Sequence, residues 1–122
     1  MRVIAPSAAG LDRASVIQGI PVRRFRYAPR AYETLAYSGT MADDVANSIS
    51  AKAALGSFIA SETAAVLSQS AAWKPDVIHA HWWFPNGVAA STAIRINGIP
   101  LVTTSNGSDR RLLQHKPAAR PL

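Results

Sequence analysis

The segment from residue 76 to residue 114 constrains the fold of this chain more than any other part of it. It contains a short apolar strand at 76–80, a helix that starts near Pro85, a strand rich in β-branched residues at 99–104 and the start of a further helix at 110–114. Pro85 suits the first turn of a helix, and Gly98 suits the position just after its C-terminal end. Strands that alternate with helices in this way are typical of a parallel sheet with right-handed crossovers. We therefore predict an α/β fold in which helices flank a parallel sheet.

The rest of the sequence adds two strands and one long helix. Residues 3–5 form a short apolar run before Pro6, and residues 21–27 form a second strand that Pro29 stops. A long helix follows Asp43 or Asp44, either of which can cap it. One face of that helix carries larger apolar residues, namely Leu55, Phe58, Ile59, Val66 and Leu67. Residues 115–122 lack periodicity and contain two prolines, so we predict a frayed tail at the end of one domain spanning 1–122.

Composition places the chain among globular proteins. Hydrophobic residues make up 48% of the sequence and charged residues 16%, without an apolar run long enough for a transmembrane helix. The sequence has no cysteine, and its first ten residues lack the apolar core of a secretory signal, which predicts a cytoplasmic protein. The net charge of +6 is compatible with anionic lipids and phosphorylated ligands.

Much of the positive charge comes from the run "RRFRYAPR" at 23–30. In a strand, Arg24 and Arg26 share one face and Arg23 lies on the other. No zinc-finger spacing, RNP aromatic motif or heptad pattern supports a nucleic-acid site. We therefore predict that this run is a solvated strand edge and that nucleic acid is not a partner.

Two polar loops follow strands of the predicted sheet. "HAHWWFPNG" follows the strand at 76–80, and "SNGSD" follows the strand at 99–104. Ligands of parallel α/β sheets bind beyond the carboxyl ends of the strands, and the N–H groups at helix starts favour anionic or hydroxyl-rich ligands. The two loops together predict a binding crevice.

His79 and His81 lie at i and i+2 and project to the same face of a strand. A zinc site needs at least one more protein ligand, and the candidates are His115 and a carboxylate such as Asp109. We therefore predict no metal site. His79 is expected in the core, bonded to a backbone carbonyl, whereas His81 is nearer the strand end and is the better candidate for ligand contact.

The residues after His81 have both structural and ligand-binding interpretations. Trp82 and Trp83 point in opposite directions in an extended chain, and core packing is favoured for both. The alternative is that one indole lines the crevice, where its face suits a sugar ring. Asn86 and Gly87 either set the geometry of the helix start or contact a ligand.

The loop "SNGSD" is either a loop with a helix cap or part of the crevice. In the second interpretation Gly107 lets the backbone approach a ligand, and Asn106 donates a hydrogen bond. Ser105 and Ser108 lack the G-x-S-x-G context of a nucleophilic serine.

The sequence "PDVIHAHWWFPNGVAA", followed by "GIPLVTTSNGSDRRLL", resembles the N-terminal half-domain of family-four glycosyltransferases with the GT-B architecture. The resemblance extends over roughly residues 3–113 and matches in order and spacing as well as in letters. It implies a partial Rossmann-like domain on the acceptor side of a cleft. The implied reaction is transfer of a sugar from a nucleotide-sugar donor to a glycan or lipid-linked acceptor, with retention of configuration, no cofactor and no metal.

The same resemblance assigns the site residues. By position, the resemblance implies that His81, Trp82 and Gly87 line the acceptor side of the cleft and that Gly107, Ser108 and Asp109 form the loop after the next strand. With Asn86 and Asn106 from the two loops, these residues make up the predicted substrate-binding set. His81 and Asn106 are the candidates for a catalytic role. A lipid-linked acceptor also implies that a cytoplasmic enzyme can contact the inner face of the membrane.

The sequence departs from the family pattern in three ways. Asn106 replaces a histidine, and an amide can neither titrate near neutral pH nor carry charge. The family's first strand with its glycine-rich loop is not found, and neither is the C-terminal domain that binds the donor. We therefore expect a fragment, truncated at both ends, that is poorly active or inactive alone.

Two other functions remain open from the residues alone. One is a non-catalytic, basic α/β binding module for a carbohydrate or anionic ligand. The other is a metal-dependent hydrolase that uses His79 and His81.

Overall fold

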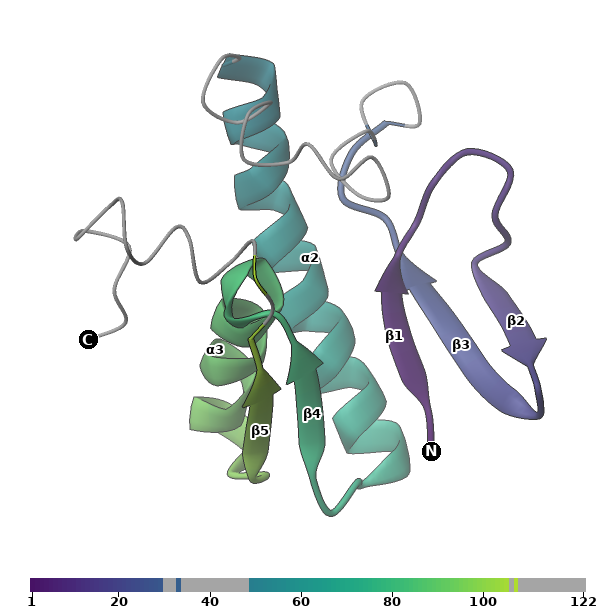
Figure 1. Cartoon of the computed structure of the whole chain (residues 1–122), viewed down its shortest axis with the longest axis vertical. Helices are drawn as coiled ribbons and strands as arrows, with labels where there is room; N and C mark the ends of the chain where they lie inside the picture. The colour runs from purple at the N-terminus through teal and green to yellow at the C-terminus, as the bar shows by residue number, and fades with distance from the viewer. Residues whose placement is uncertain (30–32, 34–48, 106, 108–122) are drawn as a thin grey trace.

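The computed structural model describes residues 1–29, 33, 49–105 and 107. Its elements, in chain order, are β1 (Val3–Pro6), β2 (Ala14–Ile17), β3 (Ile20–Phe25), α2 (Ile49–Trp73), β4 (Ile78–His81), the π-helical turn η2 (Trp83–Gly87), α3 (Val88–Asn97) and β5 (Leu101–Thr104) (Figure 1). The predicted α/β fold is confirmed.

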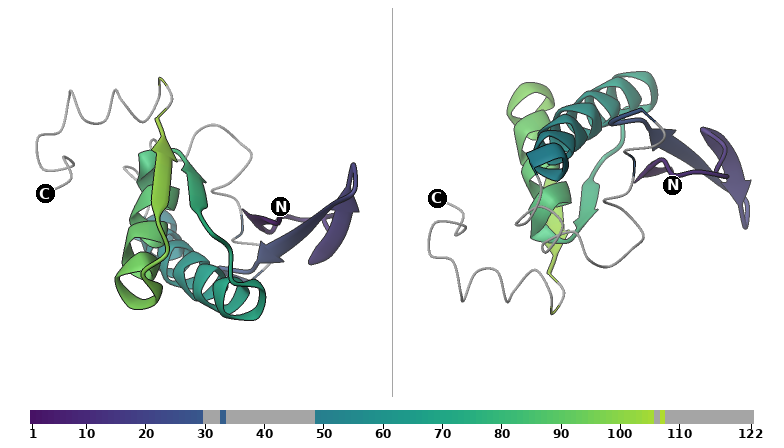
Figure 2. Two further views of the ribbon diagram at one scale, coloured as in Figure 1. Left: turned by 90° about the horizontal axis from the view of Figure 1, so that it is seen from below. Right: turned by 90° about the horizontal axis from the view of Figure 1, so that it is seen from above.

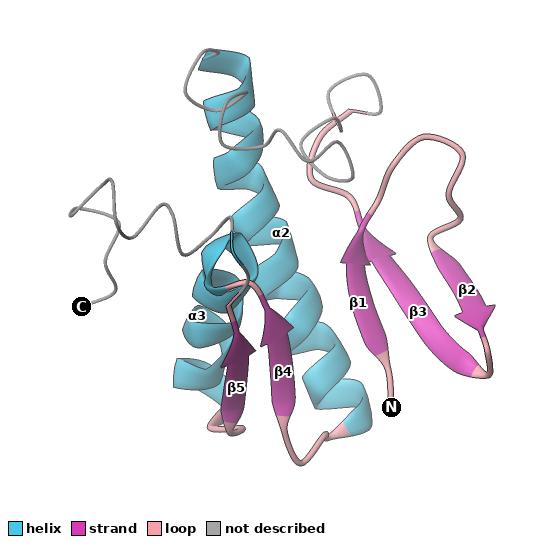
Figure 3. Cartoon of the chain, viewed as in Figure 1, coloured by secondary structure: helices cyan, strands magenta, loops and turns pink. Residues whose placement is uncertain are grey.

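The described strands form two small sheets. One sheet has the order β1-β3-β2, in which β1 is parallel and β2 antiparallel to β3. The other sheet consists of the parallel pair β4 and β5, with Ile78 beside Leu101 and His81 beside Thr104. The four strands β1, β3, β4 and β5 point in the same direction (Figure 3). The predicted parallel sheet is therefore present in two parts, and the first part is mixed because of β2.

The predicted elements are found close to their expected positions. β1 confirms the strand at 3–5, β3 confirms the strand at 21–27 but ends at Phe25, and α2 confirms the long helix. The proposed caps Asp43 and Asp44 lie outside the described residues, as do the helix at 110–114 and the tail at 115–122. Gly98 ends α3 with φ of 70°, as predicted, and its N–H donates to the Ile94 carbonyl (2.8 Å).

β2 was not predicted, because Ala14–Ile17 is a mostly exposed edge strand without clear apolar alternation. It is joined to β3 by Gln18 and Gly19, which both have positive φ (50° and 77°). Two successive positive φ values are typical of a tight hairpin turn, but Asn-Gly is the sequence that usually announces one. Because Gln18 stands where asparagine is usual, the sequence does not predict this turn.

The core lies between β3 and α2. Phe25, Tyr27, Ala54 and Phe58 form a buried cluster, and Phe58 makes edge-to-face contacts with Phe25 (5.0 Å between ring centroids) and Tyr27 (4.9 Å). Such aromatic pairs contribute about 0.5–1.5 kcal/mol each beyond the burial of their area. Phe58 and Val66 are buried as the predicted helical face requires, whereas Leu55, Ile59 and Leu67 are half-buried.

α2 and α3 pack against each other on one side of the β4–β5 sheet (Figure 2). The contact face of α3 includes Ala89, Ala90 and Ala93, all buried, and such small residues let two helices approach closely. The Thr63 hydroxyl lies 3.3 Å from the Ala89 carbonyl across this interface. Among the described residues, no helix is both long and apolar enough to cross a membrane. Both helices lie on one face of the small parallel sheet, and no described helix or strand covers the other face of β4 and β5.

Candidate functional site

The carboxyl ends of β4 and β5 lie side by side. The register places His81 beside Thr104, and the Trp82 N–H donates to the Thr104 carbonyl (2.7 Å), which continues the pairing by one residue. Trp82 then turns the chain with φ of 70°, a value unusual for a residue with a side chain. The polar loop therefore begins directly at the strand end, as the sequence predicts.

Asn86 and Gly87 fold the loop back onto the strand. The Asn86 side-chain amide donates to the His81 carbonyl (2.9 Å), and the Gly87 N–H donates to the Trp82 carbonyl (2.9 Å). A Cβ atom on Gly87 would lie 3.3 Å from the Trp82 carbonyl oxygen and 3.4 Å from the Cγ2 atom of Thr103. Both residues thus have a structural role at the start of the helix, while their contact with a substrate stays a prediction.

Pro85 begins the helical backbone that leads into α3. The Phe84–Pro85 peptide bond is cis, and Phe84 is the one residue of η2 with non-helical angles (φ −136°, ψ 132°). From Pro85 the chain runs through η2 directly into α3 at Val88. The expected helix start near Pro85 is therefore confirmed, and this first turn places Asn86 within reach of the His81 carbonyl.

His79 and His81 lie together on the open face of β4. Both are exposed, and their ring centroids are 4.4 Å apart with an angle of 31° between the ring planes. The Nε2 atom of His79 forms a hydrogen bond with the Thr104 hydroxyl (2.7 Å). The expectation that His79 is a core residue bonded to a backbone carbonyl is wrong, because the strand alternation turns Ala80 inward and both histidines outward.

Trp82 and Trp83 differ in exposure. Trp82 is 38% exposed, and Trp83 is half-buried with its ring 5.6 Å from that of Phe84. The expected core packing is therefore wrong for Trp82 and holds in part for Trp83. The exposed Trp82 leaves an indole surface available directly after His81.

The second loop is described only in part. Ser105 and Gly107 are both exposed. Asn106, Ser108 and Asp109, which the sequence analysis assigned to the site, lie outside the described residues. The structure thus brings together His81, Trp82, Asn86 and Gly87, and it adds Thr104, which sequence reasoning missed. Thr104 enters the site because the register of the two strands places it beside His81, and the sequence alone carries no signal of that register.

Comparison with known proteins decides the family. The family model described as a glycosyl transferase 4-like domain matches residues 1–122. The chain belongs to this family. Searches of curated proteins and of solved structures find no match to it. Membership implies, in general terms, a transferase that uses a sugar donor and an acceptor.

The glycosyltransferase-like domain has no complete metal site in its described part. No group of three or more His, Cys, Asp or Glu side chains gathers there. His79 and His81 supply two imidazoles, and zinc in proteins takes at least three protein ligands. Because Asp109 and His115 lie outside the described residues, the absence of a metal stays a prediction.

The arginine run of the domain is less uniform than predicted. Arg24 donates to the Asp12 carbonyl (2.9 Å) and to the Ser15 hydroxyl (2.8 Å). Arg26 pairs with the buried carboxylate of Glu33 (3.0 Å). The expected solvated edge is correct for the exposed Arg23, but Arg24 and Arg26 have structural partners.

Glu62 is the one buried carboxylate of α2 in the described residues. It is 7% exposed, and its Oε2 atom has no hydrogen-bond partner within the described part of the chain. Burial raises the pKa of Glu62 from its ordinary value of 4.5 to about 7. Sequence reasoning missed this residue because a glutamate within an alanine-rich helix normally faces solvent.

Proposed function

We propose that this domain forms the acceptor side of the cleft in a retaining glycosyltransferase of the GT-B type. The full enzyme would transfer a sugar from a nucleotide sugar to a glycan or lipid-linked acceptor. The observation that carries the proposal is the pair of exposed side chains, His81 and Trp82, at the carboxyl end of β4. Membership of the glycosyl transferase 4-like family supports the same conclusion.

The two side chains suit a sugar for different reasons. The indole of Trp82 offers an apolar face on which the C–H face of a sugar ring can stack. The imidazole of His81 can donate or accept a hydrogen bond with a sugar hydroxyl, depending on its tautomer. The bonds that Asn86 and Gly87 make to the carbonyls of His81 and Trp82 hold the backbone of this pair in place. A fixed backbone lowers the entropy that ligand binding costs.

The proposal includes a donor site outside the described residues. Among the described strands, β1 pairs only with β3, and β4 pairs only with β5. The two sheets are therefore not joined by any described strand. This arrangement supports a domain that functions as part of a larger enzyme, in which Asn106 lies beside the same cleft. The net charge of +6 supports work in the cytoplasm at the anionic inner face of a membrane.

Titration of the isotope-labelled chain with monosaccharides, disaccharides and nucleotide sugars tests the proposal. We expect saccharides to shift the backbone amide resonances from His81 to Gly87 in NMR spectra. The substitution Trp82→Ala should weaken this binding by about tenfold, because stacking on an aromatic ring typically contributes 1–3 kcal/mol.

Trp73→Ala is the matched control, because Trp73 has a similar exposure of 42% but lies at the end of α2. It should leave saccharide binding unchanged. Equal loss in both variants, or shifts confined to other residues, would contradict an acceptor site at His81 and Trp82.

A further inference from the structure

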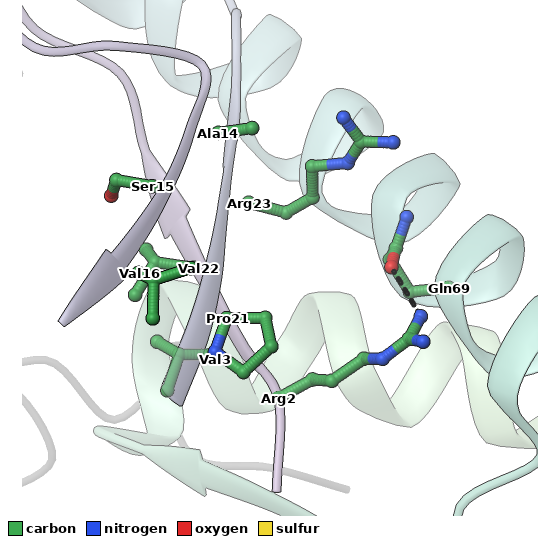
Figure 4. Close-up of a pocket in the computed structure, with 9 residues that line it drawn as sticks. All are labelled: Arg2, Val3, Ala14, Ser15, Val16, Pro21, Val22, Arg23 and Gln69. Carbon is green, nitrogen blue, oxygen red and sulfur yellow. Dashed lines mark hydrogen bonds between the residues drawn. The ribbon is translucent and has the colours of Figure 1, made fainter. Parts of the chain in front are cut away.

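A cavity of about 380 Å³ opens between the β1-β3-β2 sheet and the last third of α2 (Figure 4). Its lining includes Arg2, just before β1, Pro21, near the start of β3, and Gln69, in the last two turns of α2. The cavity therefore lies at the amino ends of the parallel strands. His81 and Trp82 lie at the carboxyl end of β4, so this cavity is separate from the proposed acceptor site.

Two arginines line the cavity, and both direct their guanidinium groups toward α2 (Figure 4). The strand register explains their common direction. Arg23 pairs with Ile4, which packs on the core beneath α2, and Arg2 lies two residues before Ile4 on the same face. The fold itself thus brings two positive charges to one side of the sheet.

Among the described residues, the two guanidinium groups have no acidic partner. No carboxylate lines the cavity, and within the described part of the chain neither Arg2 nor Arg23 forms a salt bridge. This distinguishes them from Arg26, which is paired with Glu33. An uncompensated pair of arginines in a concave site favours an anion, and the planar guanidinium group matches the geometry of phosphate in particular.

Arg2 is held in place by neutral groups. Its guanidinium carbon lies 5.3 Å from the centroid of the Trp73 ring, and its Nη1 atom lies 3.5 Å from the side-chain oxygen of Gln69. A cation over an indole face keeps its charge and most of its donors. Arg2 is therefore oriented toward the cavity while its N–H groups remain available.

The cavity also has an apolar part. Val16 is 69% exposed, and Pro21 lies beside it in the strand register, on the same face as Arg23. Apolar side chains next to two arginines suit a ligand with one anionic and one hydrophobic end. The volume is at the lower end of the range for small-molecule sites, about 300–1,000 Å³.

We propose that this cavity binds a phosphate monoester that carries a small apolar group. Arg2 and Arg23 contact the phosphate, and Val16 and Pro21 contact the apolar group. The site is an addition to the acceptor cleft and does not depend on it. The same chemistry occurs in a soluble phosphomonoester and in the headgroup of phosphatidic acid.

Two binding measurements on the full chain separate these sources. In the first, phenyl phosphate is titrated and the amide shifts of residues 2–3 and 22–23 are followed by NMR. In the second, co-sedimentation is measured with phosphatidylcholine vesicles that contain phosphatidic acid, and with phosphatidylcholine vesicles as reference. Arginine-dependent binding of phenyl phosphate supports a soluble ligand, and arginine-dependent binding of the acidic vesicles alone supports a lipid headgroup.

Arg2→Gln and Arg23→Gln should each weaken binding by about tenfold, since each substitution removes a charge-assisted hydrogen bond to the phosphate. Arg95→Gln is the matched control, because Arg95 is exposed on α3, is absent from the cavity lining and carries the same charge. NMR spectra of each variant without ligand verify the fold. The proposal is overturned if neither probe binds, if Arg95→Gln weakens binding as much as the other two, or if neutral benzyl alcohol binds as tightly as phenyl phosphate.

Discussion

Glu62 links the stability of the domain to pH. Its carboxyl group is buried on α2, and burial raises its pKa from 4.5 to about 7. Because the folded state favours the protonated form, the free energy of unfolding is not reduced by this group below pH 4.5. Between pH 4.5 and about 7, the free energy of unfolding decreases by an amount on the order of 3 kcal/mol. Above that range this group causes no further change.

We expect Glu62→Gln to remove this dependence. The variant should be more stable than the unmodified chain at pH 8 and should lose that advantage near pH 5. Urea denaturation at several pH values measures the difference between the two proteins. Asp76→Asn, which removes an exposed carboxylate, is the control and should not reproduce the effect. A difference between Glu62→Gln and the unmodified chain that is constant from pH 5 to pH 8 would refute the role of Glu62.

Some features of single residues can be predicted from the local sequence, and others depend on the tertiary fold. His81 and Trp82 could be predicted as site residues because they directly follow an apolar strand that is visible in the sequence. The exposure of His79 depends on which face of β4 the helices cover, and its bond to Thr104 depends on strand register. Neither can be derived from the residues around position 79. The burial of Glu62 could not be predicted for the same reason, since it depends on the packing around α2.

At the scale of elements, the contact between η2 and β5 depends on the absence of a side chain at Gly87. Its backbone has ordinary helical angles (φ −62°, ψ −36°), so conformation alone would permit alanine. The obstacle is steric, because a Cβ atom would meet the Trp82 carbonyl and the Thr103 side chain. The Trp82 carbonyl is fixed by its bond from the Gly87 N–H, which leaves it little room to move.

Gly87→Ala and Gly56→Ala should therefore have opposite effects on stability. Gly56 lies within α2, and apart from the helix's own backbone no atom of the described residues lies within 4 Å of a Cβ built there. Gly56→Ala should stabilise the domain by about 0.5–1 kcal/mol, since alanine favours a helix interior. Gly87→Ala should lose that gain and destabilise by roughly 1–3 kcal/mol through overpacking. Thermal or urea denaturation of the two variants decides the matter, and equal stabilisation of both would show that η2 can shift away from β5.

Elements with strong local signals were predictable. Gly98 marks the end of α3, and the β-branched residues of 99–104 mark β5. β2 lacked such signals, because it gains its structure from pairing with β3 and from a turn at Gln18 and Gly19. The π-helical turn at Trp83–Gly87 also has no pattern of its own. Its form depends on contacts with Trp82, His81 and Thr103, which come from the tertiary fold.

At the scale of the whole molecule, we propose that the donor site belongs to a part of the enzyme other than these 122 residues. The proposed acceptor residues, His81 and Trp82, lie in this domain. We expect the purified chain to bind saccharides without transferring a sugar from any nucleotide sugar to a glycan acceptor. Mass spectrometry of the acceptor after incubation measures transfer directly. Product that appears with the unmodified chain and disappears in Trp82→Ala would show that the domain is catalytic by itself.

α2 contacts β1 and β3 along one part of its surface and α3 and η2 along another. No strand pairing joins the two sheets in the described part of the chain. The folding of the two halves is therefore coupled through the side chains of one helix rather than through a continuous backbone ladder. Such coupling can be weaker than the cooperativity within either half, and local opening in proteins often follows boundaries of this kind. Two units can then unfold locally without each other. One is the hairpin of β2 and β3, and the other consists of β4, η2, α3 and β5. Unfolding of α2 would destabilise both units.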